Sequence, residues 1–240
     1  MTTLSSQNRV VLISGANRGI GRAIAECLYN EGYSLSLGVR NPQSMQSIIE
    51  QWDTGRVQVR QFDARDKQTA DDWVSAANER FQHIDAIVNN AGIVHSFDID
   101  SDQDESLLDE MWEVNVKGPL RLTRAAFPYL KQSGHGRVVN IVSLSGKRVK
   151  SGQIAGYAMT KHAAAALTHA TRQSGWEHGI RATSICPGYV ATDMTADVNF
   201  SSEDMIGTDD IARLVSTVLA LPNSASVAEV PVNCTLESQY

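Results

Sequence analysis

The chain has 240 residues, of which 42% are hydrophobic and 20% are charged. These proportions are typical of a globular protein, and they exclude a disordered, collagen-like or coiled-coil chain. The net charge of -6 and the lack of any basic run argue against nucleic acid as a partner. No apolar run approaches the ~20 residues that cross a bilayer, and the N-terminus lacks the apolar core of a secretion signal. We therefore expect a cytoplasmic protein without a membrane segment, folded as a single domain over residues 1–240.

The cysteines and histidines form no disulfide or metal-binding pattern. Cys27, Cys186 and Cys234 are odd in number and far apart, so we expect buried, reduced side chains. His162 and His169 are seven residues apart and could share a helix face, but no carboxylate accompanies them. No metal site is predicted.

Short β-branched runs alternate with longer stretches of helical pattern along the chain. The predicted strands span residues 9–14, 34–39, 56–62, 85–90, 137–143 and 180–185, with a short edge strand over 229–233. The predicted helices span residues 19–31, 42–52, 66–82, 103–132, 153–177 and 209–221. This alternation indicates βαβ units, whose right-handed crossovers favour a doubly wound architecture. The sequence therefore predicts an α/β fold, a three-layer doubly wound parallel sheet (Rossmann fold) in one domain.

A glycine-rich turn, SGANRGIG, joins the first predicted strand to the first predicted helix. Its glycines allow a tight backbone turn, and the helix that follows offers free N–H groups to an anion. This position favours binding of the phosphates of a dinucleotide, although the spacing is GxxxGxG rather than GxGxxG. The predicted cofactor-binding residues of the turn are Gly15, Asn17, Arg18, Gly19, Ile20 and Gly21.

The end of the second predicted strand distinguishes between the two nicotinamide cofactors. An acidic side chain there binds the 2′-hydroxyl of NAD, whereas a cation accommodates the 2′-phosphate of NADP. Residues 32–49 contain no Asp or Glu, and Arg40 closes the strand. With Arg18 in the glycine-rich turn, Arg40 supplies two forked cations suited to a phosphate dianion. The pattern predicts NADP(H) as the cofactor.

A tyrosine and a lysine lie one turn apart on the helix predicted over 153–177. The four-residue spacing of Tyr157 and Lys161 places them on the same helix face. A free tyrosine has a pKa near ~10, and we expect the ammonium to lower it so that Tyr157 acts as a general acid/base. Ser143 ends the strand predicted over 137–143, where doubly wound sheets place ligands and a hydroxyl can hydrogen-bond a reacting oxygen.

Taken together, these motifs resemble those of the short-chain dehydrogenase/reductase family over residues 9 to about 221. The turn SGANRGIG is similar to the TGxxxGxG motif of the family, with Ser14 in place of Thr, and residues 89–92 match its NNAG motif. The other matching positions are Asn115, Ser143, Tyr157, Lys161, Pro187, Gly188 and Thr192.

The resemblance implies an enzyme in which Ser143 orients the substrate oxygen and Tyr157 is the general acid/base. It also implies that Lys161 binds the nicotinamide ribose and lowers the pKa of Tyr157, and that Asn115 holds a water in a proton relay from Lys161. From the adenine to the carboxamide, further cofactor contacts are expected from Asp63, Ala64, Asn90, Ala91, Gly92, Pro187, Gly188, Val190 and Thr192.

The leading hypothesis is an NADP(H)-dependent oxidoreductase that interconverts the carbonyl and alcohol forms of a small-molecule substrate. The resemblance also suggests a homodimer or homotetramer. One alternative is a catalytically silent NADP-binding sensor or scaffold, although such a protein need not keep Ser143, Tyr157, Lys161 and Asn115. A ketoacyl-carrier-protein reductase is another, although the sequence shows no basic patch for an acidic carrier. A sugar-nucleotide epimerase or dehydratase fits the short C-terminal part poorly.

Two local points stay open in the sequence. Ser143 and Tyr157 are 14 residues apart, one more than the frequent spacing in the family, so Ser145 is an alternative to Ser143. The segment 192–209 is interpreted either as a lid over the substrate or as a mobile surface loop.

Overall fold

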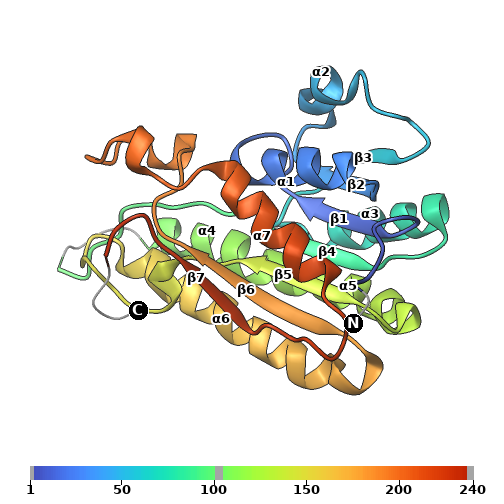
Figure 1. The fold of residues 1–240 in the computed structure, drawn as a ribbon. Coiled ribbons are helices and arrows are strands. Elements are labelled where there is room, and N and C mark those ends of the chain that lie inside the picture. The colour runs from blue at the N-terminus through green and yellow to red at the C-terminus, as the bar shows by residue number, and fades with distance from the viewer. Residues whose placement is uncertain (1–2, 101–104, 237–240) are drawn as a thin grey trace.

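A seven-stranded, wholly parallel sheet forms the centre of the protein in a computed structural model that describes residues 3–100 and 105–236 (Figure 1). The strand order is β3-β2-β1-β4-β5-β6-β7. The strands are β1 (Val10–Ser14), β2 (Ser34–Val39), β3 (Val57–Gln61), β4 (Ala86–Asn89), β5 (Arg137–Ile141), β6 (Arg181–Pro187) and β7 (Glu229–Val232). The predicted Rossmann fold is confirmed, including the short final strand, which pairs with β6.

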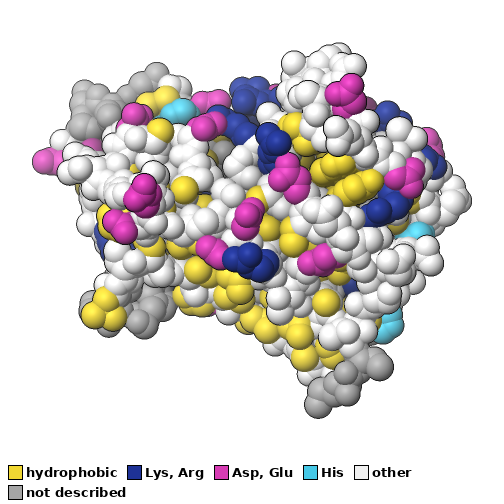
Figure 2. Space-filling view, turned by 45° about the horizontal axis from the view of Figure 1, so that its top comes forward, with side chains coloured by type: hydrophobic (Ala, Val, Ile, Leu, Met, Phe, Trp, Pro, Cys, Tyr) yellow, Lys and Arg dark blue, Asp and Glu magenta, His cyan; other side chains and the backbone are white. Residues whose placement is uncertain are grey.

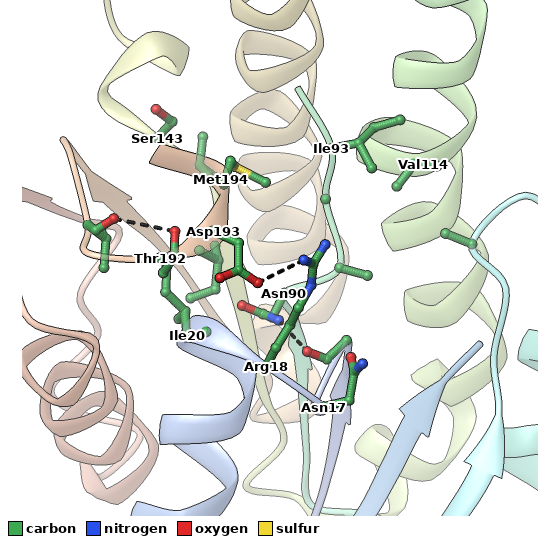
Figure 3. A pocket seen from close by; sticks show the side chains of 18 of the residues that line it. Asn17, Arg18, Ile20, Asn90, Ile93, Val114, Ser143, Thr192, Asp193 and Met194 are labelled. Atoms are coloured by element: carbon green, nitrogen blue, oxygen red, sulfur yellow. Dashed lines mark hydrogen bonds and ion pairs between the residues drawn. The ribbon is translucent and has the colours of Figure 1, made fainter. Parts of the chain in front are cut away.

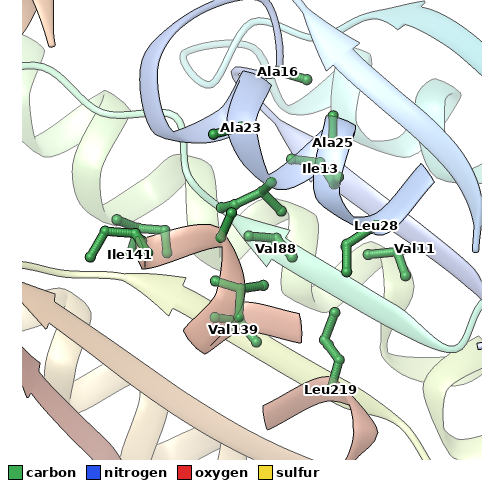
Figure 4. Close-up of a cluster of buried hydrophobic side chains, with 14 of the residues drawn as sticks. Val11, Ile13, Ala16, Ala23, Ala25, Leu28, Val88, Val139, Ile141 and Leu219 are labelled. Atoms are coloured by element: carbon green, nitrogen blue, oxygen red, sulfur yellow. The ribbon is translucent and has the colours of Figure 1, made fainter. Parts of the chain in front are cut away.

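Helices cover both faces of this sheet. They are α1 (Gly19–Asn30), α2 (Gln46–Ile49), α3 (Lys67–Phe81), α4 (Ser106–Trp112), α5 (Gly118–Ser133), α6 (Ala155–Gly175) and α7 (Thr208–Ala220). Successive side chains of a strand point to opposite faces, so β1 serves both layers. Val11 and Ile13 pack in the layer of α1 and α7 (Figure 4). Leu12 packs in the layer of α3 and α5.

Two predicted helices differ from the structure. The stretch 42–52 forms only a 3-10 turn, η1 (Pro42–Met45), followed by the four-residue α2. The stretch 103–132, whose first two residues lie outside the described residues, is divided by a π-helical turn, η2 (Glu113–Lys117). Hydrophobic periodicity does not reveal such a turn, because it covers only five residues within a continuous helical run.

The cysteines are free, and only Cys186 is buried. Cys27 and Cys234 are half-buried, which corrects the expectation that all three are core side chains. Burial raises the pKa of Cys186 to about 11, so this side chain is a neutral thiol at physiological pH.

A buried polar ladder connects the helices of one layer to the sheet. The Asn89 amide donates to Thr123 Oγ1 on α5 (3.1 Å) and to Asn140 Oδ1 on β5 (2.7 Å). The Asn140 amide in turn donates to Thr168 Oγ1 on α6 (2.7 Å). Buried hydrogen bonds of this kind fix the register of packed elements, because a shift would leave polar groups unsatisfied. Asn89 therefore has a structural role in the NNAG segment.

Trp73 on α3 packs against the backbone of β2. Its Nε1 donates to Ser36 Oγ (2.8 Å), and its six-membered ring covers Gly38, where a Cβ would lie 2.5 Å from the ring.

We therefore expect Gly38→Ala to lower the free energy of unfolding by about 1–3 kcal/mol, because the ring has no room to retreat. Urea unfolding measures this loss. In a Trp73→Phe background the same substitution should cost less, and an equal cost in both backgrounds would contradict the overpacking explanation.

Candidate active site

One cleft runs along the carboxyl edge of the sheet, where the strand order reverses between β1 and β4. In doubly wound sheets the loops at such a reversal diverge and leave a crevice for a ligand. The predicted residues that line the cleft are Gly15, Asn17, Arg18, Gly19, Ile20, Arg40, Asp63, Ala64, Asn90, Ala91, Gly92, Ser143, Tyr157, Lys161, Pro187, Gly188, Val190 and Thr192. Gly21 and Asn115 lie behind this lining.

The glycine-rich turn depends on backbone conformations and close contacts that side chains would prevent. Gly15 and Gly19 have positive φ angles of 67° and 53°. A Cβ on Gly21 would lie 2.2 Å from the carbonyl oxygen of Gly15, so the third glycine allows α1 to start directly against the turn. The free N–H groups at the start of α1 consequently border the cleft.

Ser14 and Asn90 hold the glycine-rich turn against the loop that follows β4. Ser14 Oγ accepts hydrogen bonds from the N–H groups of Asn90 (3.0 Å) and Ala91 (3.1 Å). The Asn90 amide donates to the carbonyl oxygens of Ser14 (2.9 Å) and Gly15 (3.2 Å). The Asn90 amide thus bonds the protein backbone, and the buried hydroxyl of Ser14, to which the sequence analysis gave no role, helps to build the site.

Ser143, Tyr157 and Lys161 meet at the other end of the cleft. Ser143 follows β5 and caps the 3-10 turn η3 (Leu144–Gly146), accepting a hydrogen bond from the Ser145 N–H (3.0 Å). The side chains of Tyr157 and Lys161 lie on the first turns of α6, with Lys161 Nζ 5.5 Å from the centre of the Tyr157 ring. Ser145 is buried and does not line the cleft, which favours Ser143 of the two candidate serines.

The pKa values of the tyrosine and the lysine are governed by burial. Desolvation raises the pKa of Tyr157 to about 12, opposed in part by a hydrogen bond with Ser143. Burial likewise lowers the pKa of Lys161 to about 8, because desolvation disfavours the ammonium. Its Nζ donates to the carbonyl oxygen of Ile141 (3.0 Å) and has no carboxylate partner in the described part of the chain. Desolvation of the phenol dominates in this arrangement, and the lowering of the Tyr157 pKa by Lys161 stays a prediction.

Asn115 lies in the π-helical turn η2, and its side chain makes three hydrogen bonds within the protein. Its amide exchanges two hydrogen bonds with the backbone of Ile93 (2.8 and 2.9 Å) and donates to Thr160 Oγ1 (3.1 Å). The Thr160 hydroxyl donates to the carbonyl oxygen of Tyr157 (2.8 Å). Asn115 therefore connects the loop after β4 to the turn of α6 that carries Tyr157. The Asn115 Oδ1 atom accepts one of these bonds and can accept a second, so the water that the resemblance implies stays a prediction.

Exposed charges surround the end of the cleft at which Arg40 and Asp63 lie. Arg65, which sequence reasoning missed, bonds Asp63 (2.7 Å) and lies 3.5 Å from Glu110. The Arg65 guanidinium holds the pKa of Asp63 below its usual range. Arg40 is exposed and makes no hydrogen bond or ion pair with the residues that the structure describes. Basic and acidic side chains are interspersed over the face shown in Figure 2, without a field of one sign.

The segment after β6 forms the remaining wall of the cleft. Val190 forms an isolated bridge with Ile206, so the two ends of the intervening segment lie side by side. Between them are the 3-10 turns η5 (Asp193–Thr195) and η6 (Ser202–Asp204). Met194 points into the cleft beside Ser143 (Figure 3). The segment is thus folded locally, and whether it moves as a lid stays a prediction.

Comparison with known proteins identifies the family. The family model described as short chain dehydrogenase matches residues 9–203, and the protein belongs to this family. It is 44% identical over 236 residues to an agropine synthesis reductase of Rhizobium rhizogenes, a match that covers 97% of this chain and 54% of the relative. The chain thus spans about half the length of that relative. It is also 34% identical to an uncharacterized oxidoreductase of Staphylococcus aureus, covering 97% of this chain and 99% of the relative.

Solved structures of similar proteins share the fold over almost their whole length. An alcohol dehydrogenase from Thermococcus sibiricus, complexed with 5-hydroxy-NADP, superposes with a TM-score of 0.84 at 29% identity and covers 93% of this chain and 95% of its own. A short-chain dehydrogenase from Burkholderia cenocepacia in complex with NADP has a TM-score of 0.88 at 25% identity, covering 96% of this chain and 98% of its own.

The described residues include no helix long and apolar enough to span a membrane.

The buried ammonium of Lys161 should reduce the stability of the protein. At pH 7 we expect Lys161→Met to raise the free energy of unfolding by about 1–3 kcal/mol. This gain is reduced by whatever stability is lost when the carbonyl oxygen of Ile141 no longer receives the hydrogen bond from Lys161. The lowered pKa means that folded Lys161 loses its proton at about 8, whereas the unfolded side chain keeps it to 10.5. The wild type therefore gains stability as the pH rises between these values, and the advantage of the variant should shrink there.

Urea unfolding at pH 7 and pH 9.5 measures this difference. Lys131→Met on α5 is the matched control, because Lys131 is exposed and its removal should change stability by less than about 0.5 kcal/mol at either pH. A Lys161→Met variant that is less stable than the wild type at pH 7 would contradict the expectation.

Proposed function

We propose that this protein is an NADP(H)-dependent oxidoreductase that interconverts a carbonyl and an alcohol by hydride transfer. The observation that carries the proposal is the meeting of Ser143, Tyr157 and Lys161 at one end of a cleft whose other end begins at Arg40. A sensor or scaffold would have no use for a half-buried phenol beside a buried ammonium, each of which loses hydration in the folded protein.

The cleft fits a nicotinamide dinucleotide in shape and donor chemistry. The glycine-rich turn leaves the N-terminus of α1 free of side chains, which suits a pyrophosphate. Arg40 offers an unpaired guanidinium at the end of β2, which suits a 2′-phosphate. The complexes of the Thermococcus and Burkholderia relatives with 5-hydroxy-NADP and NADP support the same assignment.

In the proposed mechanism the nicotinamide supplies or accepts the hydride. The Tyr157 hydroxyl donates a proton to the carbonyl oxygen during reduction and takes one from the hydroxyl during oxidation. Ser143 donates a hydrogen bond to the same oxygen and thereby orients it. Lys161 holds the ribose of the cofactor, and Asn115 and Thr160 fix the backbone that carries Tyr157.

The protonation state of Tyr157 at neutral pH is the one that the reductive direction requires. Because burial raises the pKa of Tyr157 to about 12, its phenol is protonated at neutral pH, which is the form that an acid needs. The relative from Rhizobium rhizogenes is also a reductase by name.

We propose a small or medium-sized carbonyl compound as substrate, since Ile93, Val114 and Met194 add apolar walls to the cleft. Assembly as a homodimer or homotetramer stays a prediction.

Removal of the Tyr157 hydroxyl tests the catalytic assignment. We expect Tyr157→Phe to lower kcat by about 10²- to 10⁴-fold, the usual contribution of a general acid/base, while the Kd for NADPH stays unchanged. NADPH oxidation with a panel of aldehydes and ketones gives the rate, and calorimetry gives the Kd. Tyr129→Phe is a control at a tyrosine of α5 outside the cleft. Undiminished turnover by Tyr157→Phe would refute the role.

Neutralisation of Arg40 tests the choice of cofactor. A hydrogen bond to a charged group is worth enough that Arg40→Gln should weaken NADP⁺ binding by about 10- to 100-fold. The affinity for NAD⁺, which lacks the 2′-phosphate, should not fall. The control is Arg60→Gln, at an exposed arginine on β3 that does not line the cleft. An equal loss for both cofactors would contradict the assignment.

A further inference from the structure

An ion pair joins the two sides of the cleft. Arg18 Nη1 donates to Asp193 Oδ2 at 2.9 Å, although the two residues are 175 positions apart in the sequence. Arg18 belongs to the glycine-rich turn, and Asp193 opens the turn η5 after β6. Figure 3 shows the two side chains reaching toward each other between the opposite walls of the cleft. The structure thus pairs one of the two predicted phosphate-binding arginines with a carboxylate.

The backbone on both sides of this ion pair is well held. A Cβ on Gly19 would lie 3.3 Å from Thr192 Cγ2, so the two loops are in close contact beside the pair. Thr195 Oγ1 donates to the carbonyl oxygen of Val190 (2.6 Å) and accepts from the Thr192 N–H (3.3 Å). Asp193 is therefore presented to Arg18 by a folded turn, and the contact follows from the packing of the loops.

The two arginines are consequently unequal. Arg40 has no ion-pair partner among residues 3–100 and 105–236, whereas the charge of Arg18 is balanced by Asp193. A guanidinium has five N–H donors, so contact with a carboxylate does not by itself prevent a second contact. Charge is the stronger constraint, because a phosphate dianion brought to Arg18 would be repelled by the carboxylate already there.

We propose that Asp193 is a specificity-determining residue that competes with the 2′-phosphate of NADP(H) for Arg18. This inference rests on the proposed function, which assigns NADP(H) to the cleft. In the free protein Arg18 bonds Asp193, and in the complex it turns to the phosphate beside Arg40. Asp193 therefore lowers the affinity for NADP(H), leaves the affinity for NAD(H) unaffected, and takes Arg18 back when the cofactor departs.

The expected effect is moderate, because the side chains of Arg18 and Asp193 are 68% and 75% exposed. Ion pairs in contact with water are weakened by solvent and salt, so we expect Asp193→Asn to tighten NADP⁺ binding by about two- to fivefold. The Kd for NAD⁺ should not change. Isothermal titration of the full chain with NADP⁺ and with NAD⁺ at low ionic strength measures both values.

Two further variants separate competition for Arg18 from a general change of field. Asp197→Asn removes an exposed carboxylate four residues further along the same segment and should leave both Kd values unchanged. Arg18→Gln should weaken NADP⁺ binding alone, and Asp193→Asn added to Arg18→Gln should bring no further change. This double-mutant cycle isolates the competition, because Asp193 can act on the phosphate through Arg18 only when Arg18 is present.

The outcomes distinguish this inference from the function on which it rests. If Asp193→Asn leaves the Kd for NADP⁺ unchanged, or tightens NAD⁺ equally, the competition is refuted. If Arg18→Gln weakens NADP⁺ binding in that same experiment, the proposed cofactor site stands without it. If Arg18→Gln has no effect on NADP⁺, Arg18 is no phosphate ligand, and both the competition and that part of the proposed site are overturned.

Discussion

The site depends on the junction where β1 and β4 end side by side. There the hydroxyl of Ser14 and the amide of Asn90 bond each other's backbone, so the glycine-rich turn and the loop after β4 form one rigid unit. Gly92 in that loop borders both Asn115 and Lys161, since a Cβ there would lie 3.3 and 3.5 Å from their side chains. The two ends of the cleft, to which we assign phosphate binding and proton donation, are therefore positioned from the same junction, at the place where the sheet topology leaves a crevice.

The two ends of the cleft differ in their exposure to water, and their electrostatics differ accordingly. Tyr157 and Lys161 are desolvated, so small geometric changes there have large effects on protonation. Arg18, Arg40 and Asp193 are exposed, where charges interact weakly and exchange partners easily. This division suits the proposed chemistry, because proton transfer needs a fixed, dry environment whereas cofactor exchange needs contacts that can be broken.

Much of the fold and of the site was predictable because it depends on patterns among residues that are close together in the sequence. Strand runs, the glycine-rich turn and the Tyr157–Lys161 spacing each involve neighbours in sequence, and the structure places their side chains along one cleft. Three features were not predictable for the opposite reason. The π-helical turn around Asn115 changes the helix phase by a single residue, and the pKa of Tyr157 depends on burial by the whole fold. The partner of Arg18 comes from a segment that shows no motif.

The pairing of Arg18 also shows why a local count of charges is a poor guide to an anion site. The lack of acids over residues 32–49 suggests that Arg18 and Arg40 are both unpaired, but the fold places the carboxylate of Asp193 against Arg18. Negative charge beside a phosphate site weakens binding, yet an enzyme must release its cofactor in every cycle, and release limits the rate of many enzymes. A carboxylate on the wall of the cleft that pairs with Arg18 lowers the affinity only for NADP(H), because only that cofactor has a 2′-phosphate for Arg18 to bind. On this proposal Asp193 favours release at the cost of some selectivity for NADP(H), and Arg40, which forms no ion pair with the described residues, maintains that selectivity.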